Sequence, residues 1–396
     1  MTQRTRPTRR TRRTRQGLAV LTAALVGATA ACAAQQPSGP RYPASAAGGG
    51  VGDGRAFTLV ASGDVLPHTS IIRQANADAG GEGYDFAPML AGAKSVVTKA
   101  DLAICHMETV YGANGDYTGY PSFKSPPQVA RGLKATGYDA CSTASNHTLD
   151  DGADGIHRTL AALDRAGVKH AGSGRTATEG RSPAWLRAGG AKVAQLAYTY
   201  GTNDIPLPEG RPWSVNLIDK DRILADARAA RKAGADVVVV SLHWGTEWQD
   251  APNRQQLSLG RQLTSARTGG RPDVDLILGT HAHVPQAYEK VNGTWIVYGM
   301  GDQIAGAMIN HEGAQDPRGN QGTAGRFTFA APERPGDRWK VTKAEFVPFW
   351  FDTDAGRLVN LNRALDRGAD VGDVRDRIRR VVLSRGAAED GLVMGE

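Results

Sequence analysis

The sequence predicts an α/β layered fold, because short apolar runs alternate along the chain with segments of helical spacing. The runs are rich in Val, Ile and Leu and end abruptly in polar residues or glycine, which is typical of strands buried on both faces. They cover residues 57–62, 101–105, 138–143, 193–199, 237–242, 274–278 and 295–298. We therefore expect a β-structure whose strands come from most of the folded part.

Helical spacing between the runs predicts helices over residues 127–136, 152–166, 219–233 and 254–266. Asp151 or Asp154 can cap the second helix, and Gly167 follows it as a C-terminal glycine should. No repeat or internal linker interrupts the pattern, so we expect one domain from residue 56 to about 308. Residues 309–396 are expected to complete that domain with a glycine-rich loop over 306–325, a closing hairpin over 326–331 and 339–349, and a basic amphipathic helix over 371–383.

The N-terminal residues 1–31 have the layout of a secretory signal peptide. Seven arginines between residues 4 and 15 precede an uncharged apolar stretch over 17–31, which is too short to span a bilayer comfortably. Small residues before Cys32 resemble a bacterial lipobox, which predicts export, lipidation of Cys32 and a position on the extracytoplasmic face of the cell membrane. Plain cleavage and an uncleaved anchor are the alternatives. Residues 32–55, rich in Ala, Gly, Pro and Ser, predict a flexible tether.

Composition excludes several classes of protein. With 396 residues, 40% apolar and 22% charged, the chain can bury a full core and is neither disordered nor collagenous. The net charge of +7 comes from the signal segment, since 47 basic residues less its seven arginines balance 40 acidic residues. A neutral mature chain argues against a nucleic-acid partner.

Cys105 and Cys141 are the cysteines that follow the tether, and they are too few for a disulfide scaffold. Both lie in apolar, strand-like runs. One interpretation is a pair of buried thiols. The other is a bridge between neighbouring strands, which is typical of an oxidising compartment.

Polar side chains follow five of the predicted strands at the point where each strand ends. They are Asp64; His106 and Glu108; Asn146 and His147; His243; and His281 and His283. Because the carboxyl ends of the strands form the ligand-binding edge of an open α/β sheet, we expect these side chains to converge. Carboxylates, imidazoles and an amide oxygen are ligands of hard or borderline divalent cations. The pattern therefore predicts a metal site, against the alternative of unrelated structural roles.

Five motifs around these residues, taken in order, resemble those of the CapA family. They are 62–66 (SGDVL), 101–109 (DLAICHMET), 145–150 (SNHTLD), 243–248 (HWGTEW) and 279–286 (GTHAHVPQ). That family is associated with poly-γ-glutamate capsule synthesis and is similar in fold to calcineurin-like dinuclear metallophosphatases. The resemblance covers roughly residues 57–306 and implies a four-layer metallophosphatase-like sandwich, with two mixed β-sheets flanked by helices.

The resemblance also implies a set of ligands for two divalent metal ions, which could be Mn, Fe or Zn. Glu108 would bridge the two ions. Asp64 and His283 would complete one side, and Asn146, His243 and His281 would complete the other. Such a pair can bind a phosphate and activate a water molecule.

Three further residues receive roles next to this metal site. His147, oriented by Asp150, would protonate the leaving oxygen. Lys124 could hold an anionic substrate by its charge, although exposed lysines are common. These roles would make the site a hydrolytic one.

Three departures from the metallophosphatase and CapA patterns leave a weaker or mononuclear site as an alternative. Leu66 stands where the phosphatases have a histidine, so one metal is a ligand short unless His68 or water substitutes. His106 replaces an asparagine of the family and could be an extra ligand or could support one. Asp302 also replaces an asparagine and adds a carboxylate of unassigned role.

We therefore expect an exported, CapA-like metal-dependent hydrolase with phosphoesterase-type chemistry, linked to poly-γ-glutamate capsule or other cell-envelope polymer synthesis. Its substrate would be a phosphoester or an anionic envelope polymer. The alternative is a non-catalytic, membrane-anchored assembly or polymer-binding subunit of a poly-γ-glutamate synthase complex, with membrane-bound synthase subunits as partners.

Overall fold

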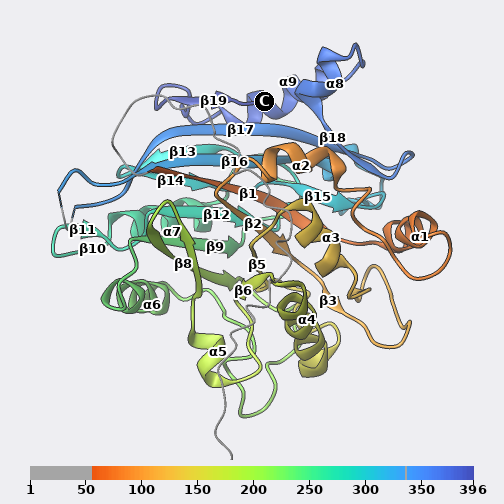
Figure 1. Ribbon diagram of the computed structural model, residues 1–396, viewed down its shortest axis with the longest axis horizontal. Helices are drawn as coiled ribbons and strands as arrows, with labels where there is room; N and C mark the ends of the chain where they lie inside the picture. Colours follow the sequence, from red (N-terminus) through yellow and green to blue (C-terminus); the bar gives the residue numbers. More distant parts are fainter. Residues whose placement is uncertain (1–55, 335–336) are drawn as a thin grey trace, which may run out of the picture. The chain divides into compact units, whose positions relative to one another are not determined.

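A computed structural model describes residues 56–334 and 337–396 of the chain (Figure 1). The predicted signal peptide, the tether and Cys32 lie outside these residues. The described part belongs to one compact unit and contains two large β-sheets with helices on their outer faces. The predicted α/β class is therefore confirmed. No helix in this part of the chain is long and apolar enough to cross a membrane.

The first sheet has nine strands, including parallel and antiparallel neighbours. In spatial order they are β18 (Arg357–Asn360), β17 (Lys340–Asp352), β16 (Gln321–Ala330), β1 (Ala56–Leu66), β2 (Leu102–Met107), β5 (Ala140–Ser142) and β6 (Lys169–Ala171), with β15 (Asp302–Ala305) beside β1 and β19 (Leu392–Met394) beside β17. The strands β1, β2, β5 and β6 are parallel. Their carboxyl ends therefore lie at one edge of the sheet.

The second sheet has six strands and is also mixed. In spatial order they are β13 (Tyr288–Val291), β14 (Thr294–Val297), β12 (Leu276–Thr280), β9 (Val237–His243), β8 (Ala191–Thr199) and β7 (Ala184–Ala188). The four central strands are parallel, and the two outer ones are antiparallel to their neighbours. The predicted pair of mixed sheets is thus confirmed.

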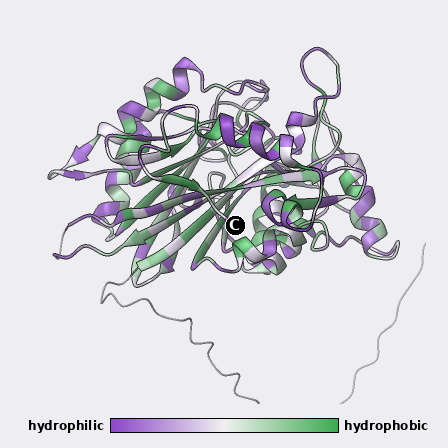
Figure 2. Ribbon diagram, turned by 90° about the horizontal axis from the view of Figure 1, so that it is seen from above, coloured by the Kyte–Doolittle hydropathy of each residue, from purple (hydrophilic) through white to green (hydrophobic). Residues whose placement is uncertain are grey.

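Helices cover the outer face of each sheet, so the fold has four layers. The first sheet carries α1 (Thr69–Asp78), α2 (Ala91–Val97), α3 (Val129–Thr136) and α4 (Gly152–Ala166), and the second carries α6 (Lys220–Lys232) and α7 (Arg254–Ser265). A third apolar core fills the space between the sheets. In Figure 2 the strands are mostly green and the helices carry much of the purple.

Alternating side chains of the central strands enter different cores. In β9, Val237 and Val239 belong to the core between the sheets, whereas Val238 and Val240 pack under α6 and α7. Both faces of the strand are therefore buried, which explains why this stretch is a continuous apolar run rather than an alternating one. The same division separates Val60 of β1 from its neighbours Leu59 and Ala61.

Two of the predicted helices show how local sequence sets an end. The helix predicted over 152–166 is α4, and Gly167 ends it in the left-handed conformation. Asp151 occupies its N-cap position, but the side chain pairs with Arg158. In α7, Asn253 and Gln256 form a capping box in which each side chain accepts a bond from the other's backbone.

The C-terminal part differs from prediction at one point. The expected loop over 306–325 is wrong in its last five residues, because β16 already begins at Gln321 and the 3-10 helix η1 (Pro317–Asn320) precedes it. Gly322 pairs with β17 and lies so close to Asp302 that a Cβ there would be 2.3 Å from the Asp302 carbonyl oxygen. The glycine therefore serves close strand packing rather than a loop. The hairpin of β16 and β17 and the helix α9 (Gly372–Val382) are present as predicted.

Several short elements have too weak a sequence signal to be predicted. They are α1, α2, β6, β7, β13, β15, β18 and β19, named above, together with β3 (Val110–Tyr111), β4 (Lys124–Ser125), β10 (Arg267–Thr268), β11 (Arg271–Pro272), α5 (Ala177–Arg181) and α8 (Leu361–Asp366). Some of them have local caps, as Thr176 at α5 and Asn360 at α8, and others depend on tertiary contacts. In α1, for example, Ile71, Ile72 and Ala75 are buried.

Cys105 and Cys141 are joined by a disulfide. They are in register on the neighbouring parallel strands β2 and β5, so the bridge between strands is the alternative that the structure adopts. The disulfide lies one residue before His106 and one before Ser142. It therefore ties together two strands that lead to the polar edge.

The far edge of the second sheet is held by a buried carboxylate. Asp275 is fully buried, and it pairs with Arg231 and, at 3.1 Å from its Oδ1, with Arg338 Nε. It also accepts a 2.8 Å bond from the Val238 N–H. Removing one partner of a buried ion pair leaves the other charge uncompensated.

We predict that Asp275→Ala lowers the free energy of unfolding by about 3–5 kcal/mol, because two arginines and a backbone N–H lose their acceptor. Urea denaturation of the purified protein measures this. Asp221→Ala, which removes an exposed carboxylate paired with Lys220, is the matched control and should change stability little. A loss at Asp275 no larger than in the control would contradict the structural role of this network.

Candidate metal centre

The polar residues predicted at strand ends lie together where the two sheets meet. Asp64 lies near the end of β1, His106 and Glu108 lie at the end of β2, and His243 ends β9. Asn146 and His147 follow β5, and His281 and His283 follow β12. All of them are at most 6% exposed. The first sheet therefore supplies five residues and the second sheet three residues of one buried cluster.

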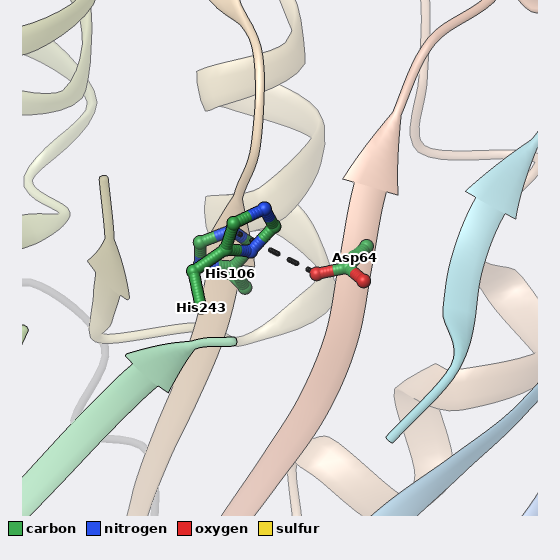
Figure 3. A group of neighbouring side chains, drawn as sticks. All are labelled: Asp64, His106 and His243. Carbon is green, nitrogen blue, oxygen red and sulfur yellow. Dashed lines mark ion pairs between the residues drawn. The ribbon is translucent and has the colours of Figure 1, made fainter. Parts of the chain in front are cut away.

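Asp64 lies at the centre of this cluster. Its Oδ2 accepts a 3.0 Å bond from the backbone N–H of His281, which links the two sheets. Its Oδ1 lies 3.7 Å from His106 Nε2. Figure 3 shows His106 and His243 with their rings one over the other and the His106 ring facing Asp64. The ring centroids are 4.7 Å apart.

Glu108 lies between the two groups of histidines. Its Oε1 is 3.6 Å from His243 Nε2 and 4.0 Å from His283 Nε2. His243 Nε2 in turn lies 2.9 Å from Asn146 Oδ1, and Asn146 Nδ2 donates to Asn203 Oδ1 at 3.2 Å. The bond to Asn203 turns the amide so that its oxygen, the atom able to bind a metal, faces the cluster.

Three of the histidines present Nε2 to the centre because a neighbour holds Nδ1. The pairs are His106 Nδ1 with Ser142 Oγ at 2.7 Å, His243 Nδ1 with Thr280 Oγ1 at 3.0 Å, and His283 Nδ1 with Asp302 Oδ1 at 2.9 Å. Such bonds fix the ring orientation and the tautomer of metal-binding histidines. Asp302 therefore orients His283, a role that the sequence left unassigned.

His281 and His283 have unusual backbones, with φ angles of 93° and 56°. Residues with side chains adopt such positive angles rarely, and these angles cluster at functional sites. The turn places both imidazoles on the same cluster, with centroids 6.0 Å apart.

Among the described residues, several buried polar atoms of this cluster have no hydrogen-bond partner. They are Asp64 Oδ1, His106 Nε2, both carboxylate oxygens of Glu108, His281 Nδ1 and Asp302 Oδ2. Each such atom costs about 1–3 kcal/mol when it is buried unpaired. Imidazole nitrogens and carboxylate oxygens are the lone-pair donors that borderline divalent cations take. The residues present therefore fit a metal centre.

Potential ligand atoms form three groups whose members lie within 4.8 Å of one another. The groups are Asp64 with His106 and His243, Asp64 with His283 and Asp302, and Glu247 with His281 and His283. Because the groups share Asp64 and His283, they are parts of one centre. The ligand chemistry of these groups suits divalent metal ions.

Burial and neighbouring charges shift the pKa values of the residues in this cluster. Burial, helped by Asp302, raises the pKa of Asp64 to about 8, and burial together with Asp64 raises the pKa of Glu108 well above its usual range. Burial lowers the pKa of His106 to about 3. For His283, burial acts downward, but Asp302 and Glu108 together raise its pKa well above the usual value. A bound cation reverses this balance by favouring ionised carboxylates and neutral imidazoles.

His147 lies beside the cluster and has its own partner. Its Nδ1 is 2.6 Å from Asp150 Oδ2, and that oxygen also accepts a 2.7 Å bond from the Phe123 N–H. The His147 ring meets the Phe123 ring edge-on, with centroids 4.7 Å apart. Asp150 and Phe123 thus fix the orientation of the imidazole and leave Nε2 free to act.

The structure places two of the candidate residues, His68 and Lys124, in other surroundings, and it also shows where Leu66 packs. Leu66 packs into an apolar cluster with Phe123, Ala305 and Met308. His68 Nδ1 accepts a 3.1 Å bond from the Gly306 N–H and is not part of the three ligand groups found in the described residues. Lys124 pairs with Asp116.

Residues that sequence reasoning missed also border the centre. Glu247 lies in a motif already compared with the family, but nothing in its position marks it as a ligand. Tyr200 directly follows β8 and its ring packs against that of His281 in a tilted arrangement, with centroids 4.4 Å apart. Its place after a parallel strand is the same signal that identified the other residues. Burial raises the pKa of Tyr200 to about 12, so the hydroxyl stays protonated near neutrality.

Comparisons with solved structures give fold-level similarity at low identity. A putative 5′-nucleotidase from Staphylococcus aureus has a TM-score of 0.46 and 14% identity, covering 74% of this chain and 54% of that chain. The calcineurin-like phosphoesterase YfkN from Bacillus subtilis has a TM-score of 0.43 and 13% identity, covering 82% of this chain and 99% of that chain.

Sequence comparisons are more specific. Capsule biosynthesis protein CapA of Bacillus anthracis is 28% identical over 182 residues, which are 45% of this chain and 42% of the relative. A probable polyglutamine synthesis accessory protein of Mycobacterium tuberculosis is 27% identical over 220 residues, which are 52% of this chain and 56% of the relative. The chain therefore spans about half the length of these curated relatives.

A family model described as bacterial capsule synthesis protein PGA_cap matches residues 58–307, which is more than half of the chain. The matched region contains every residue of the metal centre described above. The predicted resemblance to CapA is confirmed, and the chain belongs to the bacterial capsule synthesis protein (PGA_cap) family.

Proposed function

We propose that this protein is a metal-dependent hydrolase with phosphoesterase-type chemistry that acts in the synthesis of a capsule or another cell-envelope polymer. The observation that carries catalysis is the His147 and Asp150 pair beside the cluster, and metal dependence rests on the ligand atoms that are buried and unpaired among the described residues of both sheets. Such a set is costly to keep unless cations use it. The family membership and the names of the relatives support the link to capsule synthesis.

The ligands would be Asp64, Glu108, Asn146, His243, His281 and His283, with Glu108 between two ions. His106 would be a further ligand of the ion beside Asp64. Divalent ions held there would polarise a phosphoryl oxygen and acidify a water molecule. These mixed ligands accommodate Mn, Fe and Zn, so the availability of each metal in the cell would help to decide which one binds.

The proton for the leaving oxygen would come from His147. Asp150 holds Nδ1 of this ring at 2.6 Å, so the opposite nitrogen is the one that can donate. The Phe123 N–H fixes Asp150 in turn. His147 is 6% exposed, which limits its exchange of protons with bulk water. General-acid catalysis of this kind contributes roughly 10²–10⁴-fold in rate.

Export and lipidation at Cys32 would place this site on the extracytoplasmic face of the membrane. There it would meet a phosphoester or an anionic polymer such as a γ-glutamyl chain. Lys124 stays a candidate for holding the anion, although its partner in the structure is Asp116.

A second candidate function is a non-catalytic subunit that binds polymer or synthase at the membrane. It is favoured by one observation, the word "accessory" in the name of the Mycobacterium tuberculosis relative. In that case the metal would serve structure.

We predict that the purified full-length protein holds about two metal ions per chain and that His281→Ala lowers this number to one or none. Elemental mass spectrometry gives the stoichiometry. His157→Ala is the matched control, because His157 is an exposed histidine on α4. About one ion in the unaltered protein would indicate the mononuclear alternative, and none after reconstitution with Mn, Zn and Fe would overturn the metal-dependent hydrolase.

We also predict that His147→Ala slows hydrolysis of an alkyl phosphate by roughly 10²–10⁴-fold, while hydrolysis of p-nitrophenyl phosphate falls much less. The nitrophenolate leaves without a proton, so it does not need the acid. Steady-state rates on both esters, at equal metal content, measure the difference. Equal losses on the two esters would contradict the proton-donor role, and turnover of neither ester nor of γ-glutamyl polymer by the unaltered protein would favour the accessory subunit.

A further inference from the structure

The segment after β9 is folded back over the metal centre. Gly245 turns the chain with a φ of 107°, and a Cβ there would lie 2.8 Å from the buried Gln256 side chain. The Trp248 N–H then donates to the Ala282 carbonyl at 2.9 Å. Ala282 lies between His281 and His283, so this bond fixes the segment to the loop that carries both histidines.

Glu247 is the residue that this fold-back brings to the histidines. One carboxylate oxygen of Glu247, one nitrogen of His281 and one nitrogen of His283 lie within 4.8 Å of one another. The Glu247 side chain is 31% exposed, whereas His281 and His283 are 4% and 6% exposed. The carboxylate therefore approaches the histidines from the solvent side.

Each of the two histidines near Glu247 has a nitrogen that can bind a ligand. Within residues 56–334 and 337–396, His281 Nδ1 is buried and has no hydrogen-bond partner. Asp302 holds His283 through Nδ1, so Nε2 is the nitrogen left for a ligand. Glu247 Oε2 lies 3.8 Å from Nε2 of the exposed His311. That exposed pair is too weak to fix the position of Glu247.

Leu66 explains why an additional ligand is useful at this place. Its side chain is buried in an apolar cluster, and Trp248 packs against the same cluster. Strand β1 therefore supplies Asp64 to the centre, but at position 66, where the phosphatases have a histidine, it supplies no ligand. The segment that covers Leu66 with Trp248 is the same one that presents Glu247.

We propose that Glu247 is a ligand of the cation on the Asp64 and His283 side and that, lying next to His281 as well, it closes the metal centre on its solvent side. The inference rests on the proposed metal centre and adds a ligand to it. Four carboxylates, from Asp64, Glu108, Glu247 and Asp302, then surround the cations. Glu247 supplies a negatively charged ligand on the solvent side of the centre. It therefore offers the outer cation a ligand that Leu66 does not provide.

The test compares Glu247→Gln with the unaltered full-length protein. Mn²⁺ and Zn²⁺ are titrated into metal-free samples in competition with a coloured chelator, which reports affinity independently of turnover. Loss of a partner that only orients a ligand weakens metal affinity by roughly 10–100-fold, so loss of a direct ligand should weaken one of the two ions at least tenfold. The rise in melting temperature on adding metal should shrink in parallel, because binding stabilises the native state by mass action.

Glu312→Gln is the matched control, because it removes the same charge from an exposed position in a nearby loop. Glu247→His should restore most of the affinity, since imidazole can replace a carboxylate as a ligand. If Glu247→Gln binds both ions as tightly as the unaltered protein, this inference is wrong and the metal centre stands. If the unaltered protein binds no metal, the inference and the proposed function fail together.

Discussion

The contact between β1 and the loop after β12 determines how the two halves of the metal centre meet. Asp64 accepts a bond from the His281 N–H across the two sheets, so a ligand of one sheet is fixed to the backbone of a ligand from the other. Strand β1 also approaches the segment before β15 so closely that only glycine fits: a Cβ on Gly63 would lie 1.8 Å from the Gly301 oxygen. Shifting β1 would separate Asp64 from Asp302 on one side and from His281 on the other.

Much of the fold and the main body of the site could be predicted because they follow from geometry that every α/β protein shares. The run over 237–242 is apolar throughout because both faces of β9 are buried, and that pattern is readable without a structure. Parallel strands of one sheet end at the same edge, so the polar residues after β1, β2 and β5 come near one another, as do those after β9 and β12. The two edges meet through a tertiary contact, the bond from the His281 N–H to Asp64. Together these two effects bring Asp64, Glu108, Asn146, His243, His281 and His283 into one cluster.

The rest depended on contacts between distant segments, which leave no periodic signal. Glu247 faces His281 because Trp248 donates to Ala282, a bond between two loops. Gly322 is part of a strand because Asp302 lies close behind it, although a glycine-rich stretch reads as a loop. Leu66 looked like a missing ligand, but its place is set by an apolar cluster formed with Phe123 and Met308. In each case the neighbour across the fold, and not the local sequence, decides the residue's position.

The two proposed functions make different demands on the same centre. Unpaired buried ligand atoms lower the stability of the metal-free fold, and cations offset that cost whether or not the protein turns over a substrate. Metal binding therefore suits a hydrolase and an accessory subunit equally. The His147 and Asp150 pair is different, because its Nδ1 contact and the Phe123 N–H orient an imidazole that is not among the proposed metal ligands. A structural metal needs no such group beside it, whereas a leaving oxygen does, and this pair is the reason to favour catalysis.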